Sequence, residues 1–244
     1  MRGLKIKVLV IIPAYNEENS VSGVVKSLCD TVNGDNYTVD YIVVNDCSTD
    51  STEGVCRENG LRHVSLRNNL GIGGGVQTGY IYALEGGYDI AVQMDGDGQH
   101  DPVSLDDLVM PIISGDADMT VGSRFLGTGD FFSTGMRRIG IRWLRLMVTL
   151  VSGVRIKDVT SGYRAVGREL ISHFACCYPC DYPEPETIAA AAKMGYRIAE
   201  VPVIMHFRNS GRSSIRALKC VYYIIKVTAA ILIGSRAPGR RYER

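Results

Sequence analysis

Hydrophobic positions along this chain fall into two patterns, short continuous runs and segments with helical spacing. The continuous runs are rich in valine and isoleucine and predict buried strands at residues 4–12, 39–44, 62–66, 89–94 and 118–122. Apolar side chains three or four positions apart predict a helix at 21–28, and further helices are expected after the turn residues 48–52, at 71–85 and after Asp101-Pro102. Strands that alternate with helices are typical of an α/β protein with a mostly parallel sheet and right-handed crossovers.

The alternation becomes less regular after residue 122. The pattern predicts a loop, two helices, a strand and a terminal helix, at 125–135, 137–151, 184–194, 197–203 and 214–233 in that order. No internal repeat and no low-complexity linker interrupts the chain. We therefore expect one domain at residues 1–213, followed by a C-terminal helix and tail at 214–244.

Composition narrows the class of protein. The 244 residues, 45% hydrophobic and 22% charged, suit an ordinary globular domain with a sizeable core. Seven scattered cysteines, an odd number, suit a reducing cytoplasm better than a disulfide framework. The net charge of +1 hides an asymmetry, because residues 197–244 carry ten Lys/Arg against two acids. This basic segment predicts anionic partners, either phosphates or a membrane surface, and we expect no nucleic acid.

The most informative residues follow the run at 89–94. Asp95, Asp97 and Gln99 alternate, so an extended tip of the strand could point all three the same way. In a parallel sheet they would lie at the carboxyl ends of the strands, where open α/β sheets bind ligands. Oxygen ligands of this kind suit Mg²⁺ or Mn²⁺, a metal that usually also holds a substrate phosphate.

Three other predicted strands also end in polar residues, at 13–17, at Asp46 and at 68–75. Because the carboxyl ends of parallel strands meet at one edge, a shared site explains the four sets better than four unrelated turns. The glycines at 71–75 do not follow the first strand, so the dinucleotide-binding fingerprint does not fit, and no P-loop motif exists. An EF-hand that began at Asp95 would put His100 where a glycine is needed.

The four sets read Val10-Ile-Ile-Pro-Ala-Tyr-Asn-Glu-Glu, Val43-Val-Asn-Asp46-Cys-Ser-Thr-Asp, Asn68-Asn-Leu-Gly71 and Asp95-Gly-Asp97-Gly-Gln99. This order resembles family 2 glycosyltransferases of the GT-A fold, and most of all the dolichyl- and polyprenyl-phosphate sugar synthases. The resemblance covers residues 5–215. It implies a single Rossmann-like GT-A domain at 1–213 and an amphipathic, interfacial helix beyond it.

By that likeness, the nucleotide of a sugar donor is held by residues from all four sets, namely Pro13, Ala14, Tyr15, Glu17, Asp46, Asn68, Gly71, Gly74 and Asp95. Asp95, Asp97 and Gln99 resemble the ligands of the divalent cation, Mg²⁺ or Mn²⁺, that bridges the donor diphosphate. Physical chemistry agrees, because a divalent cation stabilises the charge that develops on a diphosphate leaving group.

The resemblance extends into the second half of the chain. Gly122-Ser-Arg124-Phe resembles a turn whose arginine approaches the donor or acceptor phosphates, and residues 158–164, Asp-Val-Thr-Ser-Gly-Tyr-Arg, resemble a segment that lines the acceptor side. Residues 206–214 resemble a loop that closes over substrate, although Ser214 stands where many relatives carry lysine. We assign contacts with an acceptor phosphate to Arg124, Arg138, Arg208 and Ser213.

Three acids are available as a catalytic base, namely Asp158, Glu184 and Glu186. Transfer to a hydroxyl needs such a base, whereas a phosphate monoester is already largely anionic at neutral pH and needs none. The prolines at 183 and 185 also fit a plain helix start whose acids complement the helix dipole. We assign catalytic roles to Asp158, Glu186 and Arg124.

These observations predict a metal-dependent, inverting glycosyltransferase that moves a sugar from a nucleotide sugar to a polyprenyl phosphate. A UDP-linked donor is favoured, and a GDP-linked donor stays open. Two alternatives stay open, namely transfer to a sugar hydroxyl of a cell-surface polysaccharide precursor and an inactive homologue that only binds a nucleotide sugar. A nucleotidyltransferase would be expected to carry a glycine-rich loop after its first strand, and residues 13–17 are not one.

The C-terminal helix predicts where the enzyme works. Residues 220–234 carry a single charge, Lys226, but as a helix they span only about 22 Å against roughly 30 Å of hydrocarbon. Basic residues flank them on both sides, which is typical of a helix that lies on anionic lipid. In the helix at 137–151, arginines face one side and Ile139, Trp143, Leu146 and Leu150 the other. We expect a cytoplasmic enzyme, peripheral on the inner face of the membrane; packing on the sheet, a small membrane-protein partner or a second copy would also explain these helices.

Overall fold

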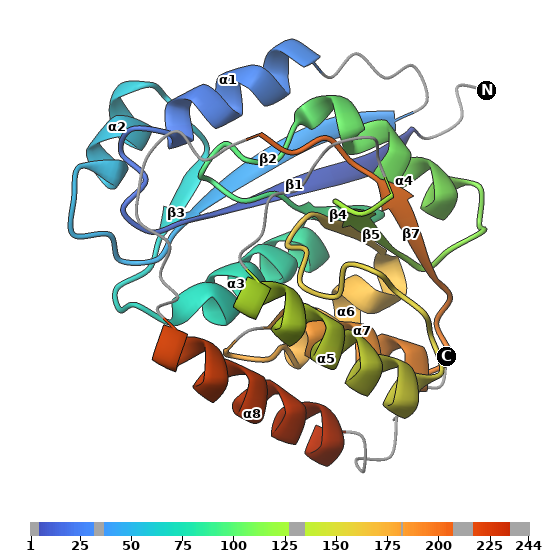
Figure 1. The fold of residues 1–244 in the computed structure, drawn as a ribbon. Helices are drawn as coiled ribbons and strands as arrows, with labels where there is room; N and C mark the ends of the chain where they lie inside the picture. The colour runs from blue at the N-terminus through green and yellow to red at the C-terminus, as the bar shows by residue number, and fades with distance from the viewer. Residues whose placement is uncertain (1–4, 32–36, 127–134, 182, 207–216, 235–244) are drawn as a thin grey trace.

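The centre of the protein is a seven-stranded sheet with the strand order β3-β2-β1-β4-β6-β5-β7 (Figure 1). The structure, a computed structural model, describes residues 5–31, 37–126, 135–181, 183–206 and 217–234. The strands are β1 (Ile6–Ala14), β2 (Tyr37–Asn45), β3 (His63–Ser65), β4 (Ile90–Gln93), β5 (Met119–Ser123), β6 (Arg164–Gly167) and β7 (Ile198–Pro202). Every strand except β6 runs in one direction, and β6 is antiparallel to both of its neighbours.

The predicted α/β class with a mostly parallel sheet is confirmed. The hydrophobic pattern places β1 to β5 and β7 within a few residues of their observed positions. It does not predict β6 or the helix that follows it, α6 (Arg168–Cys176). The sequence of β6 is only Arg-Ala-Val-Gly, and its first residue is charged, so it has no hydrophobic run.

Helices cover both faces of the sheet because the central strand β1 is apolar on both of its sides. On one face lie α1 (Val21–Thr31), α2 (Thr52–Glu58), a short 3₁₀ helix (Pro102–Ser104) and α4 (Leu105–Ile113). On the other lie α3 (Gly71–Glu85), α5 (Gly135–Ser152), α6 and α7 (Pro183–Lys193). Val8, Val10 and Ile12 of β1 pack toward the first group, and Leu9 and Ile11 toward the second.

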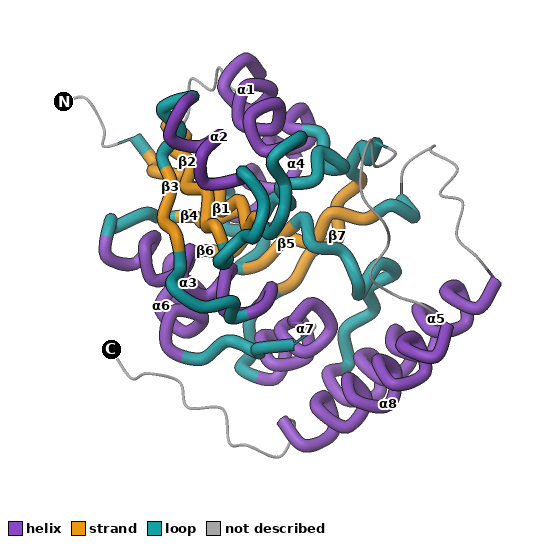
Figure 2. Tube along the Cα trace, turned by 90° about the vertical axis from the view of Figure 1, so that its left-hand side faces the viewer, coloured by secondary structure: helices purple, strands orange, loops and turns teal. Residues whose placement is uncertain are grey.

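The terminal helix α8 (Ala217–Gly234) forms an outer layer, packed on α5 and α7 rather than on the sheet (Figure 2). Lys226 of α8 forms an ion pair with Asp181, just before α7, and Trp143 of α5 donates to Thr228 Oγ1 at 3.0 Å. None of the helices in the described ranges is both long enough and apolar enough to cross a bilayer.

Close packing of α3 on β1 leads to a prediction about Gly79. A Cβ at this position would lie 2.2 Å from Ile11 Cγ2, so Gly79→Ala should lower the free energy of unfolding by about 2 kcal/mol or more through overpacking. Gly54→Ala in α2, where a Cβ meets nothing within 4 Å, should instead raise it by about 0.5–1 kcal/mol through helix propensity. Urea unfolding monitored by circular dichroism measures both, and equal effects would contradict the proposed packing.

Candidate functional site

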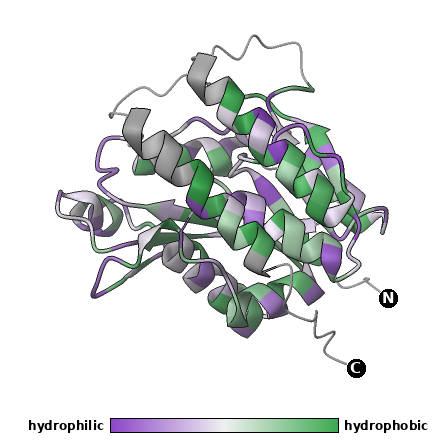
Figure 3. Cartoon of the chain, turned by 60° about the horizontal axis from the view of Figure 1, so that its bottom comes forward, coloured by the Kyte–Doolittle hydropathy of each residue, from purple (hydrophilic) through white to green (hydrophobic). Residues whose placement is uncertain are grey.

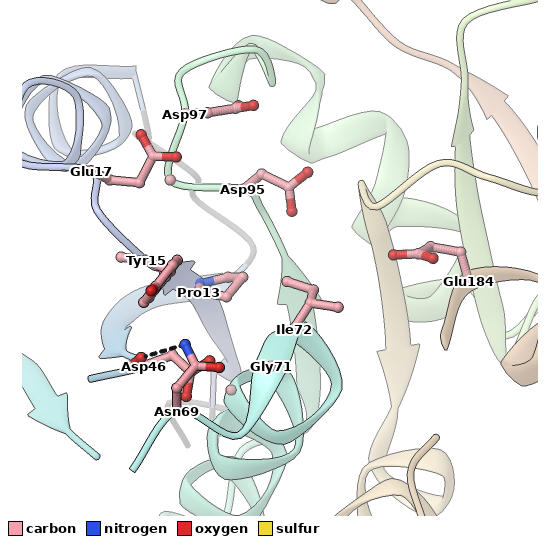
Figure 4. Close-up of a pocket in the computed structure, with 13 residues that line it drawn as sticks. Pro13, Tyr15, Glu17, Asp46, Asn69, Gly71, Ile72, Asp95, Asp97 and Glu184 are labelled. Carbon is pink, nitrogen blue, oxygen red and sulfur yellow. Dashed lines mark hydrogen bonds between the residues drawn. The ribbon is translucent and has the colours of Figure 1, made fainter. Parts of the chain in front are cut away.

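A cavity of about 410 Å³ opens at the carboxyl edge of the sheet, where the ends of β1, β2 and β4 meet (Figure 4). Eight predicted residues line it: Pro13, Ala14, Tyr15, Glu17, Asp46, Gly71, Asp95 and Asp97. Asn69, Ile72, Gly75, Gly96 and Glu184 complete the lining. The predicted contacts Asn68 and Gly74 are not among these residues, and their neighbours Asn69 and Gly75 lie there instead. A cavity of this size matches the usual volume of small-molecule sites.

Asp46 is fixed at one end of the cavity. Its Oδ1 accepts a hydrogen bond from the backbone N–H of Leu70 at 2.7 Å, and its backbone oxygen accepts one from Asn69 Nδ2 at 3.0 Å, shown dashed in Figure 4. The backbone N–H of Asp46 donates to Ala14 O at 2.9 Å. These bonds hold the loops after β1, β2 and β3 together, so Asp46 is buried yet has a fixed position in the lining.

The loop after β1 is tied to the segment before α2. Asn16 adopts a left-handed backbone conformation with φ 57°, which asparagine tolerates better than most residues. Its backbone N–H donates to Ser48 Oγ at 3.0 Å, its side-chain oxygen accepts from the N–H of Thr49 at 2.8 Å, and the N–H of Glu17 donates to Thr52 Oγ1 at 2.9 Å. This anchoring leaves the neighbouring Tyr15 ring half exposed at the mouth of the cavity.

Asp95 and Asp97 follow β4 and face the middle of the cavity (Figure 4). The carboxylate of Asp95 packs against the backbone of Gly162, where a Cβ would lie 2.9 Å from Oδ2. Any larger residue at position 162 would therefore displace this carboxylate. Asp97 Oδ1 accepts the backbone N–H of Gln99 at 3.0 Å, which closes the loop between the two acids and Gln99.

His100 supports this acidic loop, a role that the sequence pattern does not predict. It is buried, it stacks on Tyr163 with ring centroids 4.7 Å apart, and its Nδ1 lies 3.0 Å from the backbone N–H of Asp95. Burial lowers the pKa of His100, so the neutral ring accepts this bond through Nδ1 and carries its proton on Nε2, 3.8 Å from Asp95 Oδ2. Its position directly after the acidic loop was the available sequence signal.

Arg124 and Asp158 form a buried ion pair beyond the acidic loop. Arg124 Nε donates to Asp158 Oδ2 and Arg124 Nη2 to Asp158 Oδ1, both at 2.6 Å, and the backbone N–H of Arg124 adds a third bond at 3.1 Å. The side chain of Asp158 is completely buried. In this arrangement both carboxylate oxygens of Asp158 hold Arg124 in place.

Two of the candidate acids lie on the first turn of α7, and the structure separates them. Glu184 lines the cavity and faces Asp95 across it, whereas Glu186 is half-buried and is not part of the lining (Figure 4). Burial raises the pKa of both carboxyl groups, and the charge of Arg164 partly opposes that rise at Glu184. The remaining predicted contacts, namely the side chain of Arg138 together with Arg208 and Ser213, lie outside the described residues.

The donor set fits a hard divalent cation that takes part of its ligands from a bound substrate. Asp95 and Asp97 contribute carboxylate oxygens to the same open cavity, as Mg²⁺ and Mn²⁺ prefer. Gln99, the third predicted ligand, is not in the lining, and its side-chain nitrogen lies 3.4 Å from His206 O. Within the described ranges, no group of three acidic, histidine or cysteine residues could hold a metal unaided.

The buried ion pair predicts a stability difference. Asp158→Asn should lower the free energy of unfolding by about 3 kcal/mol, because Arg124 keeps its charge but loses a buried counterion. Asp118→Asn removes the partner of the exposed Arg197 and should leave the urea midpoint nearly unchanged. Urea titrations of both variants test this expectation. An equally small loss of unfolding free energy in both would show that groups other than Asp158 stabilise the buried charge of Arg124.

Comparisons with known proteins agree with this geometry. The sequence profile of the family described as "Glycosyl transferase family 2" matches residues 9–174. The chain is 32% identical over 221 residues to the undecaprenyl-phosphate mannosyltransferase of Micrococcus luteus. That match covers 85% of this chain and 87% of the relative. It is 31% identical over 217 residues to the UDP-N-acetylglucosamine–dolichyl-phosphate N-acetylglucosaminyltransferase of Methanococcus voltae. That match covers 80% of this chain and 84% of the relative.

The fold also matches a solved GT-A structure. The glucosyl-3-phosphoglycerate synthase of Mycobacterium tuberculosis, solved with Mn²⁺, UDP-glucose and phosphoglyceric acid, superposes with a TM-score of 0.68. The match covers 95% of this chain and 79% of that chain at 23% identity, which establishes a shared fold. Taken with the profile match and the two relatives, the acidic loop and the polar strand ends place this chain in glycosyl transferase family 2, as a glycosyltransferase.

Proposed function

We propose that this glycosyltransferase moves a glycosyl unit from a UDP-sugar to the phosphate of a polyprenyl lipid, with inversion at the anomeric carbon. The observation that carries the proposal is the cavity in which Asp46 and the acidic pair Asp95 and Asp97 lie at separate positions along one wall. The nucleobase and the diphosphate of a nucleotide sugar need two such positions. The names of the relatives from Micrococcus luteus and Methanococcus voltae support a polyprenyl or dolichyl phosphate as acceptor.

The nucleoside would occupy the part of the cavity between Tyr15 and Asp46. The half-exposed Tyr15 ring offers an aromatic face for stacking, and the buried Asp46 carboxylate offers an acceptor for an N–H of the base. Gly71 and Asn69 close this part of the lining. Uracil carries one ring N–H suited to such an acceptor, and UDP bound to the M. tuberculosis fold neighbour supports uracil over guanine.

Asp95 and Asp97 would hold the metal, with Gln99 contributing only after its side chain leaves the carbonyl oxygen of His206. Bound Mg²⁺ or Mn²⁺ would neutralise the charge that develops on the departing diphosphate. The Mn²⁺ in the fold neighbour supports a divalent cation here. His100 and Gly162 would keep the Asp95 carboxylate in its position before substrate arrives.

The acceptor phosphate would approach from the side of Arg124. Asp158 orients the guanidinium of Arg124, and Arg138, Arg208 and Ser213 remain the other proposed contacts. A phosphate monoester is largely ionised at neutral pH, so it attacks without a protein base, and Asp158 need not serve as one. Glu186 becomes necessary as a base only if the acceptor is a hydroxyl.

The donor and metal assignments can be tested together with Asp97→Ala. Wild-type protein with Mn²⁺, a panel of UDP-sugars and a short-chain polyprenyl phosphate should release UDP and form a glycosyl phospholipid, identified by mass spectrometry. Loss of Asp97 should reduce the rate by about 10²–10³-fold, the size seen when one electrostatic stabiliser of a transition state is removed. Asp107→Ala, which removes an exposed acid of α4, is the matched control. Release of pyrophosphate, or full activity in excess chelator, would contradict the assignment.

We also propose that α5 and α8 lie on an anionic membrane surface. Exposed apolar side chains form a stripe on α5, at Ile139, Trp143, Leu146 and Leu150, and two more are exposed on α8, at Ile225 and Leu232. The bond from Trp143 to Thr228 brings the two helices together, and Figure 3 presents them at the front with their apolar segments in green. Arg142 and Arg145 are exposed beside the stripe and would contact lipid phosphates.

Flotation with liposomes tests this surface. Wild-type protein should float with vesicles that contain phosphatidylglycerol, and Leu146→Ser/Leu150→Ser should reduce the floated fraction several-fold, because each change removes apolar area that would be buried in lipid. Ile81→Ser/Leu84→Ser, which changes two exposed apolar residues on α3, should float like wild type. Equal flotation of the two double variants would argue against membrane contact through α5.

A further inference from the structure

Glu184 occupies a part of the cavity that the proposed nucleotide and metal contacts leave open. It comes from the first turn of α7, whereas the other lining residues come from the end of β1, from the loops after β1, β2 and β4, and from residues 69–75. Figure 4 shows its carboxylate pointing toward Asp95 from the opposite wall. If the proposed function holds, the nucleobase lies near Asp46 and the diphosphate near Asp95. The glycosyl unit beyond the diphosphate then lies beside Glu184.

The position of Glu184 depends on a buried arginine. Arg164, at the start of β6, is completely buried, and its Nη1 donates to Glu184 O at 3.2 Å and to Thr187 Oγ1 at 2.7 Å. Its Nη2 donates to the backbone oxygen of Ser161, next to the glycine against which the Asp95 carboxylate packs. One guanidinium therefore links the backbone under Asp95 to the backbone of Glu184 and sets the separation of the two walls.

The surroundings of this guanidinium are polar and incompletely paired. Arg164 Nε and Gln93 Oε1 are buried and have no hydrogen-bond partner within the described part of the chain, although the two residues are direct partners in the β4–β6 ladder. The buried hydroxyls of Tyr80 and Tyr178 are also unpaired in the same ranges. Unpaired buried groups cost free energy, so the geometry of the wall behind Glu184 rests on the bonds that Arg164 does form.

The carboxyl group of Glu184 is itself short of partners. No lysine, arginine or histidine forms a salt bridge with it among the residues that the structure describes. Burial raises the pKa of Glu184, and Asp95 adds to the rise, while the charge of Arg164 and a hydrogen bond from the backbone N–H of Glu184 oppose it. The hydroxyl groups of a sugar would donate hydrogen bonds to this carboxylate, as water does to exposed carboxylates. An amide or a methyl group at position 184 would accept fewer of these bonds.

We propose that Glu184 binds hydroxyl groups of the donor's glycosyl unit and so selects among nucleotide sugars, and that Arg164 is the residue that positions it. The inference rests on the proposed function, because it takes the cavity to hold a UDP-sugar. It assigns Glu184 a contact with the donor rather than the proton transfer that a hydroxyl acceptor would require.

Calorimetric titration tests the inference without turnover. UDP and three UDP-sugars (glucose, galactose and N-acetylglucosamine) are titrated into the full chain with Mn²⁺, and the ratio of the UDP Kd to the UDP-sugar Kd isolates the contribution of the sugar. For the preferred sugar, Glu184→Ala should lower this ratio about tenfold and Glu184→Gln less, because hydrogen bonds to a charged group are lost or weakened. The Kd of UDP itself should stay within about twofold in both variants, since Glu184 would not touch the nucleotide.

Two further variants separate positioning from folding. Thr187→Val keeps the shape of its side chain but removes the oxygen that Arg164 contacts at 2.7 Å, so it should lower the same ratio about threefold with an unchanged Kd for UDP. Glu85→Gln removes an exposed acid from the end of α3 and should leave the ratio unchanged. A purely structural role of Thr187 would instead weaken UDP and UDP-sugar equally.

The outcomes are distinguishable. If wild-type protein binds neither UDP nor any UDP-sugar, the proposed donor is wrong and the inference falls with it. If it binds both and Glu184→Ala leaves the ratio unchanged, or if Glu186→Gln lowers the ratio while Glu184→Gln does not, the inference alone is wrong. Thermal melting of each variant identifies any loss that comes from unfolding.

Discussion

Two guanidinium groups, those of Arg124 and Arg164, are buried beside the cavity, and a guanidinium keeps its charge at any physiological pH. The chain must therefore supply acceptors in the interior, and the acceptors it supplies are the segments that shape the site. Asp158 accepts from Arg124, and backbone oxygens of Ser161 and Glu184 accept from Arg164. The requirement to compensate these charges ties the segments that carry Asp158, Ser161 and Glu184 to one another beside the cavity.

The two halves contribute differently to the cavity. Residues of the first half come from the carboxyl ends of β1, β2 and β4 and provide oxygen atoms and an aromatic ring. The second half provides Gly162, which limits the position of the Asp95 carboxylate, and Glu184 on the opposite wall. The match to glycosyl transferase family 2 spans residues 9–174, so it covers the first contribution and includes Gly162 but stops short of Glu184.

The sequence was sufficient for the parts of the fold in which polar residues follow a hydrophobic run. Residues 13–17, Asp46 and Asp95 each end such a run, and parallel pairing brings them to one edge. The strand β6 escaped prediction because it has four residues, one of them a buried arginine with two acceptors, Glu184 O and Thr187 Oγ1, that are distant in sequence. Contacts distant in sequence also decide which of Glu184 and Glu186 faces the cavity, so helical spacing could not predict it. Two acids two positions apart face different directions, and the tertiary packing of α7, which includes the bond from Arg164 to Glu184 O, turns Glu184 toward the cavity.

The antiparallel direction of β6 has a consequence for the modularity of the molecule. β5 ends at the functional edge with Ser123, and β6 begins at that same edge with Arg164, while the two strands are directly paired. The forty residues between them, α5 included, leave and re-enter the sheet at one place. The ends of this excursion carry Arg124, Asp158 and Gly162 of the site, whereas its middle, α5, can be changed without shifting the register of any strand. Transplanting α5 alone between relatives would thus exchange the surface that it presents while leaving the residues of the cavity in place.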